Sequence, residues 1–192
     1  MKKNKQHLIF EGAELVGKSF LAAQIYNFLE KKDNSNKKIL NGCHWFNCDV
    51  GIFGGPYGKK VINKYIDILK ILKNKNVIFE KFHLSDMVYN KLYNNKLINY
   101  QKEEQLLKKL NSKIILITVG DKKIFEQRII NRIKNVPHYQ RIAQPAENYL
   151  KQQELYLEFI KKSQLKNLII DFSKPLNKNF VKRQIKTILN WI

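Results

Sequence analysis

The sequence predicts a doubly wound parallel β-sheet of about five strands with helices on both faces. Short apolar runs alternate with stretches of helical periodicity along the whole chain. The run at 114–119 is apolar almost throughout, as in a central parallel strand that helices cover on both faces. A length of 192 residues suits one domain with a full core. We therefore treat 1–192 as a single α/β domain.

The first apolar run, at 8–10, leads into a loop with the pattern Gly-x-x-x-x-Gly-Lys-Ser, and a helical pattern follows the loop. This is the spacing of a P-loop, in which the glycines let successive backbone N–H groups turn toward phosphate oxygens. The helix that follows directs its N-terminus at the same anion. We expect phosphate contacts from the whole loop: Gly12, Ala13, Glu14, Leu15, Val16, Gly17, Lys18, Ser19 and Phe20.

Three side chains of this loop are expected to act directly in the chemistry. Lys18 would bridge the outer phosphates of ATP as a catalytic cation, and the Ser19 hydroxyl would be a ligand of Mg²⁺. Glu14 lies inside the loop and is expected to face the acceptor, where it would contact a sugar hydroxyl. The pattern thus predicts ATP and Mg²⁺ as ligands.

The next elements lead to a second candidate carboxylate. A strand is expected within 39–49, a glycine-rich loop at 51–58 and a helix over 61–72. The loop is either a substrate-side element or an ordinary turn, and the sequence favours neither. The apolar run 77–79 predicts a buried strand that brings Glu80 to the same sheet edge as the P-loop. There Glu80 would hold Mg²⁺ through water or accept a proton from an acceptor hydroxyl.

The rest of the chain continues the alternation of strands and helices. Ser85 or Asp86 is expected to cap the helix that follows Glu80. Pro137 is expected to end the helix before it. Further helices are expected over 103–110, 122–134, 147–161 and 178–192, and further strands over 114–119 and 167–171.

Arginine is scarce in this lysine-rich chain and is unevenly distributed. Three of its four arginines, Arg128, Arg132 and Arg141, fall within 122–150. Arg128 and Arg132 are four residues apart and so share one helix face. A guanidinium grips phosphate with two hydrogen bonds, which an ammonium cannot do. We therefore predict a helical lid over 122–150 that carries all three arginines, with Arg128 and Arg132 catalytic; the alternative is a helix with ordinary surface charges.

Two stretches resemble the sequence motifs of a kinase family. Residues 10–19, Phe-Glu-Gly-Ala-Glu-Leu-Val-Gly-Lys-Ser, resemble the Phe-Glu-Gly-x-Asp-x-x-Gly-Lys-Ser/Thr opening of thymidylate kinases. Residues 79–90 are similar to the family's Asp-Arg-Tyr/Phe-x-x-Ser-x-x-x-Tyr-Gln stretch, with Glu80 closer to the Glu-Arg-Ser motif of the related deoxynucleoside kinases. The resemblance extends to the arginine lid and to 168–171, so it covers most of the chain.

The resemblance implies an activity and several contacts. It implies transfer of a phosphoryl group from ATP to a nucleoside or nucleoside monophosphate. Glu80 would then act as base or metal-side carboxylate, and Lys81 would touch the substrate phosphate. The residues that would stack on the acceptor base are Tyr57, Phe82 and Tyr89.

Two departures from the family keep other classes of function open. Lys81 replaces an arginine and loses its bidentate geometry, and Leu15 stands where a small residue is usual, which predicts a loop of different shape or weaker binding. Both would suit a nucleotide-binding protein that does not catalyse. The formal charge of +20 would suit a nucleic-acid-associated protein, such as a polynucleotide-end kinase. The basic residues are spread over nearly every expected element, which favours an ordinary basic surface instead.

The sequence also indicates a location. It contains no run of about 18 apolar residues, and the basic residues at 2–5 lead straight into the first strand instead of a signal-peptide core. We expect a cytoplasmic protein with no membrane segment. The oligomeric state stays open, a homodimer included.

Overall fold

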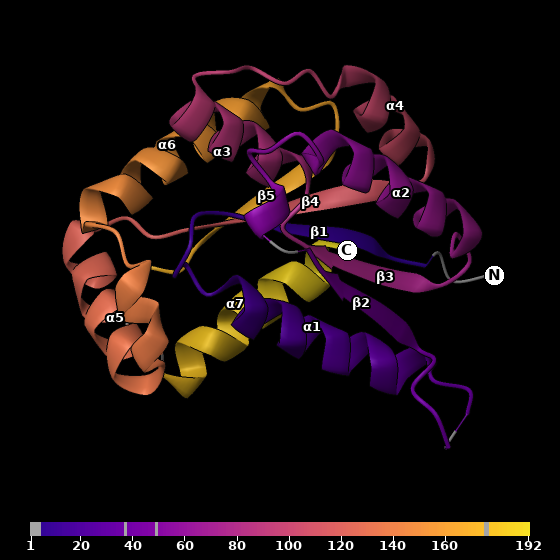
Figure 1. Cartoon of the computed structure of the whole chain (residues 1–192). Helices are drawn as coiled ribbons and strands as arrows, with labels where there is room; N and C mark the ends of the chain where they lie inside the picture. Colours follow the sequence, from indigo (N-terminus) through magenta and orange to yellow (C-terminus); the bar gives the residue numbers. More distant parts are fainter. Residues whose placement is uncertain (1–4, 37, 49, 175–176) are drawn as a thin grey trace.

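A single parallel sheet organises the chain (Figure 1). The computed structural model describes residues 5–36, 38–48, 50–174 and 177–192. Its five strands lie in the order β2-β3-β1-β4-β5, and every neighbouring pair is parallel. This confirms the predicted doubly wound sheet, although Asp49, at the end of the expected second strand, lies outside the described residues. The strands are β1 (His7–Glu11), β2 (Cys43–Asn47), β3 (Asn76–Glu80), β4 (Ser112–Thr118) and β5 (Lys166–Asp171).

Helices cover both faces of the sheet (Figure 1). One face carries α1 (Lys18–Asp33) and α7 (Lys178–Trp191). The other carries α2 (Gly58–Ile71), α3 (His83–Asn94), α4 (Gln101–Lys109) and α6 (Ala146–Lys162). At the carboxyl edge of the sheet lies α5 (Lys122–Asn135), and two short 3-10 helices, η1 (Val50–Ile52) and η2 (Pro137–Arg141), lie in connections. No helix in the described part of the chain is both long and apolar enough to cross a bilayer.

The sheet separates two apolar cores. In β1, Leu8 and Phe10 pack in the core that includes α1 and α7, whereas Ile9 packs in the core that includes α2 and α3. In β4, Ile115 and Leu116 alternate between the cores in the same way. Successive side chains of a strand point to opposite faces, so a sheet covered on both faces needs apolar residues at every position. This is why the three central strands, β1, β3 and β4, contain unbroken apolar runs.

Parallel pairing aligns the carboxyl ends of β1 and β3. Phe10 lies opposite Glu80 in the register of these two strands, and the Lys81 N–H donates to the Phe10 carbonyl at 2.9 Å. The loop that follows β1 and the carboxylate that ends β3 therefore leave the sheet side by side. Ligand sites in sheets of this type lie at this edge.

The start of α3 corrects one expectation. This helix begins at His83, so Ser85 and Asp86 lie inside its first turn, and neither side chain caps it. The prediction that one of them caps the helix was wrong. The carboxylate that accepts the first N–H groups of α3 belongs to Glu11, which ends β1 more than 70 residues earlier in the chain.

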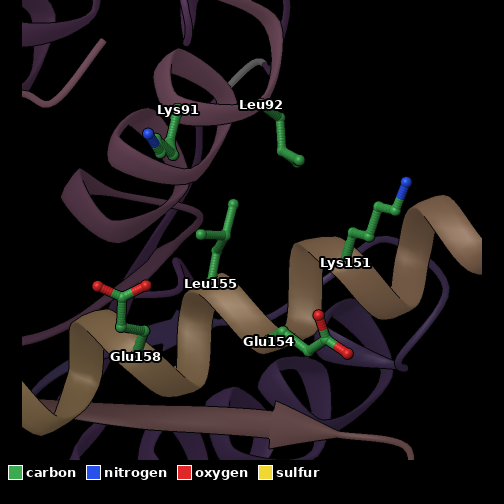
Figure 2. A pocket seen from close by; sticks show the side chains of 6 residues that line it. All are labelled: Lys91, Leu92, Lys151, Glu154, Leu155 and Glu158. Atoms are coloured by element: carbon green, nitrogen blue, oxygen red, sulfur yellow. The ribbon is translucent and has the colours of Figure 1, made fainter. Parts of the chain in front are cut away.

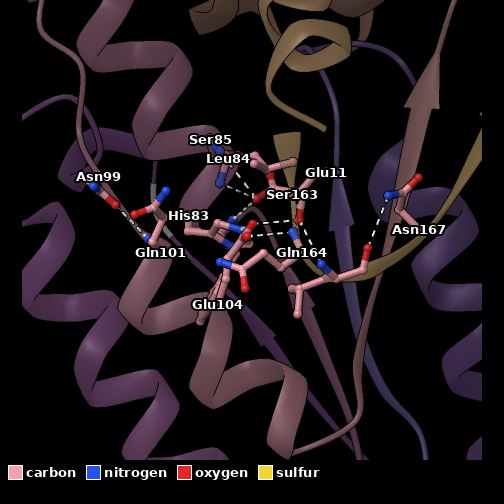
Figure 3. Close-up of polar contacts among 12 residues, drawn as sticks. Glu11, His83, Leu84, Ser85, Asn99, Gln101, Glu104, Ser163, Gln164 and Asn167 are labelled. Atoms are coloured by element: carbon pink, nitrogen blue, oxygen red, sulfur yellow. Dashed lines mark hydrogen bonds and ion pairs between the residues drawn. The ribbon is translucent and has the colours of Figure 1, made fainter. Parts of the chain in front are cut away.

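Glu11 accepts four hydrogen bonds at the beginning of α3 (Figure 3). Its Oε1 accepts the backbone N–H groups of Phe82 and Leu84, each at 3.0 Å, and that of Ser85 at 3.3 Å. Its Oε2 accepts the Ser85 hydroxyl at 2.5 Å. The first N–H groups of a helix have no partner within the helix and attract negative charge. Glu11 thereby fixes α3, and the Glu80–Phe82 bend before it, to the strand that carries the P-loop.

We expect Glu11→Ala to lower the free energy of unfolding by about 3 kcal/mol, because it leaves several buried N–H groups without an acceptor. Urea unfolding followed by circular dichroism measures this change. Glu126→Ala, at an exposed position of α5, is the control and should change stability by less than about 0.5 kcal/mol. Equal losses in the two variants would contradict the proposed role of Glu11.

Candidate active site

Two hollows of similar size differ in what lines them. One lies between α3 and α6 and has a volume of about 380 Å³; none of the predicted site residues lines it (Figure 2). Its lining residues are Lys91, Leu92, Lys151, Glu154, Leu155 and Glu158. The other, of about 420 Å³, lies at the mouth of the P-loop. It is lined by Glu14, Leu15, Gly17, Lys18, Ser19, Phe20, Glu80, Lys81, Arg132, His138, Tyr139 and Ile142. This second hollow, the P-loop pocket, is the candidate site.

The backbone of the P-loop needs its first glycine and tolerates an unusual leucine. Gly12 has φ 140°, and a Cβ there would lie 2.4 Å from the Ile117 carbonyl oxygen, so no other residue fits. Leu15 takes the left-handed conformation with φ 63°, at a cost of about 1 kcal/mol. The loop therefore closes with Leu15 in place, at a position where a small residue was expected. Strain of this kind is common at functional sites.

Lys18 lies beneath the loop and bonds to it. Its ammonium donates to the carbonyl oxygens of Gly12 at 2.8 Å and Ala13 at 2.6 Å, and the side chain is buried. Burial lowers the pKa of Lys18 to about 8, although the nearby Glu80 and Glu14 carboxylates act in the opposite direction. A phosphate in the loop would meet this cation at a site where water screens it little.

Ser19 and Glu80 form a pair at the other side of the pocket. The Ser19 hydroxyl donates to Glu80 Oε1 at 2.5 Å. Glu80 is almost fully buried, and its Oε2 has no hydrogen-bond partner among the described residues. A buried carboxylate oxygen without a protein partner is costly, so this oxygen is suited to bind a cation. A hydroxyl and a carboxylate are ligands that Mg²⁺ prefers, and these two residues therefore fit that ion.

Glu14 and Lys81 extend the pocket on the acceptor side. Glu14 accepts hydrogen bonds from the phenols of Tyr89 at 2.6 Å and Tyr139 at 3.4 Å. Lys81 follows Glu80 with φ 63° and lines the pocket. The pocket is thus lined by the cations of Lys18, Lys81 and Arg132 and by two carboxylates, Glu80 from β3 and Glu14 from the loop. Such a surface suits a ligand that carries both phosphates and hydroxyl groups.

The predicted base-stacking residues do not all reach this pocket. Phe82 has no exposed surface and packs on Phe79, with ring centroids 4.8 Å apart, so it belongs to the core. Tyr57 is 64% exposed and lines a different hollow along α2. Tyr89 meets the pocket only through its bond to Glu14. Of these three rings, only Tyr89 lies next to the pocket, so the assignments of Phe82 and Tyr57 are corrected.

The three lid arginines also separate. Arg132 lines the pocket, with its guanidinium 5.7 Å from the centre of the Tyr139 ring. Arg128 instead donates to the backbone carbonyls of Leu15 and Phe172, each at 2.8 Å. Arg141 is exposed and does not line the pocket. The lid segment therefore supplies one cation to the pocket and one to the back of the loop, where three had been expected over the phosphates.

Several residues of the site were missed by the sequence analysis. Tyr139 and His138 line the pocket from η2, and Phe172, which follows β5, supplies a carbonyl to Arg128 and a ring beside Gly17. The Gln152 side chain accepts the Glu14 N–H at 3.3 Å. No local pattern in the sequence marks these residues, because each acts through contacts with distant segments.

Arg128→Lys should lower the free energy of unfolding by about 1–2 kcal/mol, because an ammonium cannot serve both carbonyls with the same geometry. Urea unfolding measures it. Arg141→Lys makes the same chemical change at an exposed position and should shift stability by less than about 0.5 kcal/mol. A neutral effect of Arg128→Lys would mean that its two hydrogen bonds do not hold the loop.

Comparisons with known proteins bear on the fold. No family model matches the chain, and no curated protein matches it. Solved structures do resemble it: the YorR protein of Bacillus subtilis in complex with phosphorylated GDP has a TM-score of 0.67 at 17% identity, over 96% of both chains. Deoxyadenosine kinase of M. mycoides, with the products dCMP and dCDP, has a TM-score of 0.59 at 20% identity, over 97% of this chain and 98% of that one.

A third solved structure also resembles the chain. Thymidylate kinase of Ehrlichia chaffeensis has a TM-score of 0.55 at 14% identity, over 97% of this chain and 99% of that one. At such identities the likeness concerns the fold. The chain has the α/β fold of P-loop nucleoside and nucleotide kinases, with its five-stranded parallel sheet and flanking helices.

Proposed function

We propose that this protein transfers the γ-phosphoryl group of ATP, with Mg²⁺, to a nucleoside or nucleoside monophosphate. The observation that carries the proposal is the Ser19–Glu80 pair at the mouth of the P-loop, 2.5 Å apart, with the second Glu80 oxygen buried and without a partner. A phosphate loop alone occurs in many nucleotide-binding proteins. The addition of a carboxylate, Glu80, at the Ser19 hydroxyl of the loop favours phosphoryl transfer over binding alone.

The phosphates of ATP would bind backbone N–H groups of the loop from Gly12 to Ser19, other than that of Glu14, which donates to Gln152. Lys18 would exchange its bonds to the Gly12 and Ala13 carbonyls for bonds to the outer phosphates, and Arg132 would meet the γ-phosphate from the lid segment. The Ser19 hydroxyl would be a ligand of Mg²⁺, and Glu80 would either hold the ion through water or act as the base. When bound, that ion neutralises charge that develops on the phosphates during transfer.

The acceptor would approach from the side of Glu14 and Lys81. An acceptor oxygen forms a bond to the γ-phosphorus while the bond to the bridging oxygen of ADP breaks. If the acceptor is a hydroxyl, its proton passes to the Glu80 carboxylate; if it is a phosphate, no proton needs a base. Glu14 would bind a sugar hydroxyl, Lys81 the substrate phosphate, and the Tyr89 phenol would orient Glu14.

A screen of nucleosides and nucleoside monophosphates with ATP and Mg²⁺, read by release of ADP, tests the proposal. Turnover that depends on one of these acceptors is expected. ADP release that requires oligonucleotide ends and weakens steeply with salt would instead favour a polynucleotide-end kinase, which the charge of +20 would suit. Binding of ATP without turnover on any acceptor would favour a protein that only binds nucleotides.

Glu80→Gln should lower kcat by about a hundredfold or more while the affinity for ATP changes little, because the amide neither takes a proton nor neutralises the metal. Steady-state kinetics and calorimetric titration with ATP separate the two quantities. Glu147→Gln, an exposed lid carboxylate, serves as the control. A collapse of ATP affinity with normal turnover of the bound ATP would rule out this role for Glu80.

The affinity for ATP should fall as the pH rises above about 8, by about tenfold per pH unit while the other groups stay unchanged. Burial lowers the pKa of Lys18 to about 8, so the free protein carries this charge below that pH and loses it above. Bound phosphate favours the charged form, and binding near pH 8.5 should therefore take up a proton, which titrations in buffers of different ionisation enthalpy detect. An affinity independent of pH between 7 and 9.5 would show that Lys18 does not contact the phosphates.

A further inference from the structure

Each oxygen of the Glu14 carboxylate accepts a hydrogen bond from a tyrosine. Tyr89, from α3, donates to Oε1 at 2.6 Å. Tyr139, from η2, donates to Oε2 at 3.4 Å. The first distance is that of a strong charge-assisted bond, and the second is at the long limit of a hydrogen bond. The carboxylate is therefore held firmly on one side and weakly on the other.

The weak contact is the end of a chain of hydrogen bonds from the lid segment. The Gln144 N–H donates to the Tyr149 hydroxyl at 3.1 Å, and the hydroxyls of Tyr149 and Tyr139 lie 2.7 Å apart. Because Tyr149 already accepts from Gln144, its proton is free to point at Tyr139, and the Tyr139 proton then points at Glu14. Bonds in such a chain strengthen one another. Burial raises the pKa of both Tyr139 and Tyr89, so each phenol keeps its proton at neutral pH.

The Tyr139 contact also spans two parts of the proposed site. Tyr139 belongs to the lid segment, and Glu14 belongs to the P-loop, 125 residues earlier. Backbone bonds from Ile142 and Ala143 to the Tyr139 carbonyl, at 3.0 and 2.9 Å, fix the residues that follow. The position of Tyr139 therefore sets the position of the turn 139–143 over the pocket.

We propose that Tyr139 is a positioning residue whose phenol holds the place of an acceptor hydroxyl on Glu14, so that a sugar hydroxyl releases this part of the lid when it binds. The proposal rests on the proposed function for the identity of the ligand. The hydroxyl takes the Oε2 side, where the bond is long, and the Tyr89 bond at 2.6 Å stays. Binding of the acceptor thus replaces the Tyr139 hydroxyl with a sugar hydroxyl as the donor to Glu14 Oε2.

The contact itself is tested in the protein without ligands. Tyr139→Phe removes only the hydroxyl, and the ring remains in its place, so the fold should be kept. Hydrogen exchange of the amides of Ile142 and Ala143 should become at least about fivefold faster, because the phenol loses its bonds to both Glu14 and Tyr149. Tyr26→Phe removes a phenol on α1, outside the lining of the pocket, and should leave this exchange unchanged. Unchanged exchange in Tyr139→Phe, with a melting temperature equal to that of the wild type, overturns the proposal.

The exchange of donors is tested by calorimetric binding of a nucleoside monophosphate that turns over in the acceptor screen, and of its 2′,3′-dideoxy analogue. Tyr139→Phe removes a competing donor, so the Kd of the hydroxyl-bearing ligand should fall by about fivefold, and that of the dideoxy analogue should stay the same. Equal shifts for both ligands, or no shift, overturn the proposal. If the screen gives no turnover, the proposed function fails; the same hydroxyl-specific shift, measured with thymidine monophosphate as the probe, would still support the role of Tyr139.

Discussion

The parallel pairing of β1 with β3 is the constraint on which the site depends. It places Phe10 opposite Glu80 and thereby sets the end of one strand beside the loop that leaves the other. From this one register follow the bond between Ser19 and Glu80 and the four bonds from Glu11 to the beginning of α3. Because both strands are buried on both faces, the register has little freedom to slip. The carboxylate and the phosphate loop are positioned by the core of the protein.

Much of the fold could be predicted from the sequence because its signals are local. Unbroken apolar runs identify strands covered on both faces, and the glycine spacing identifies the P-loop without reference to any distant residue. The position of Glu80 followed from a topological rule, since parallel strands end at one edge of a sheet. The run at 114–119 became β4 (Ser112–Thr118), within two residues of the expected bounds.

The parts that could not be predicted are contacts between distant segments. Glu11 binds the first N–H groups of α3 in place of Ser85 or Asp86, because β1 ends beside β3, the strand that leads into this helix. The guanidinium of Arg128 is chemically suited to bind phosphate, but it donates to the Leu15 carbonyl at the back of the loop instead. Aromatic residues are equally ambiguous: Phe82 lies in the core, whereas Tyr139, which no pattern marks, borders the pocket.

A crystal structure of the protein with ADP and Mg²⁺ tests the central claim most directly. We expect the β-phosphate at the backbone N–H groups of the loop from Gly12 to Ser19, bonded by the Lys18 ammonium. We expect the ion at the Ser19 hydroxyl, with Oε2 of Glu80 turned toward it directly or through water. Phosphates bound elsewhere, or an ion that leaves Glu80 without any partner, would contradict it.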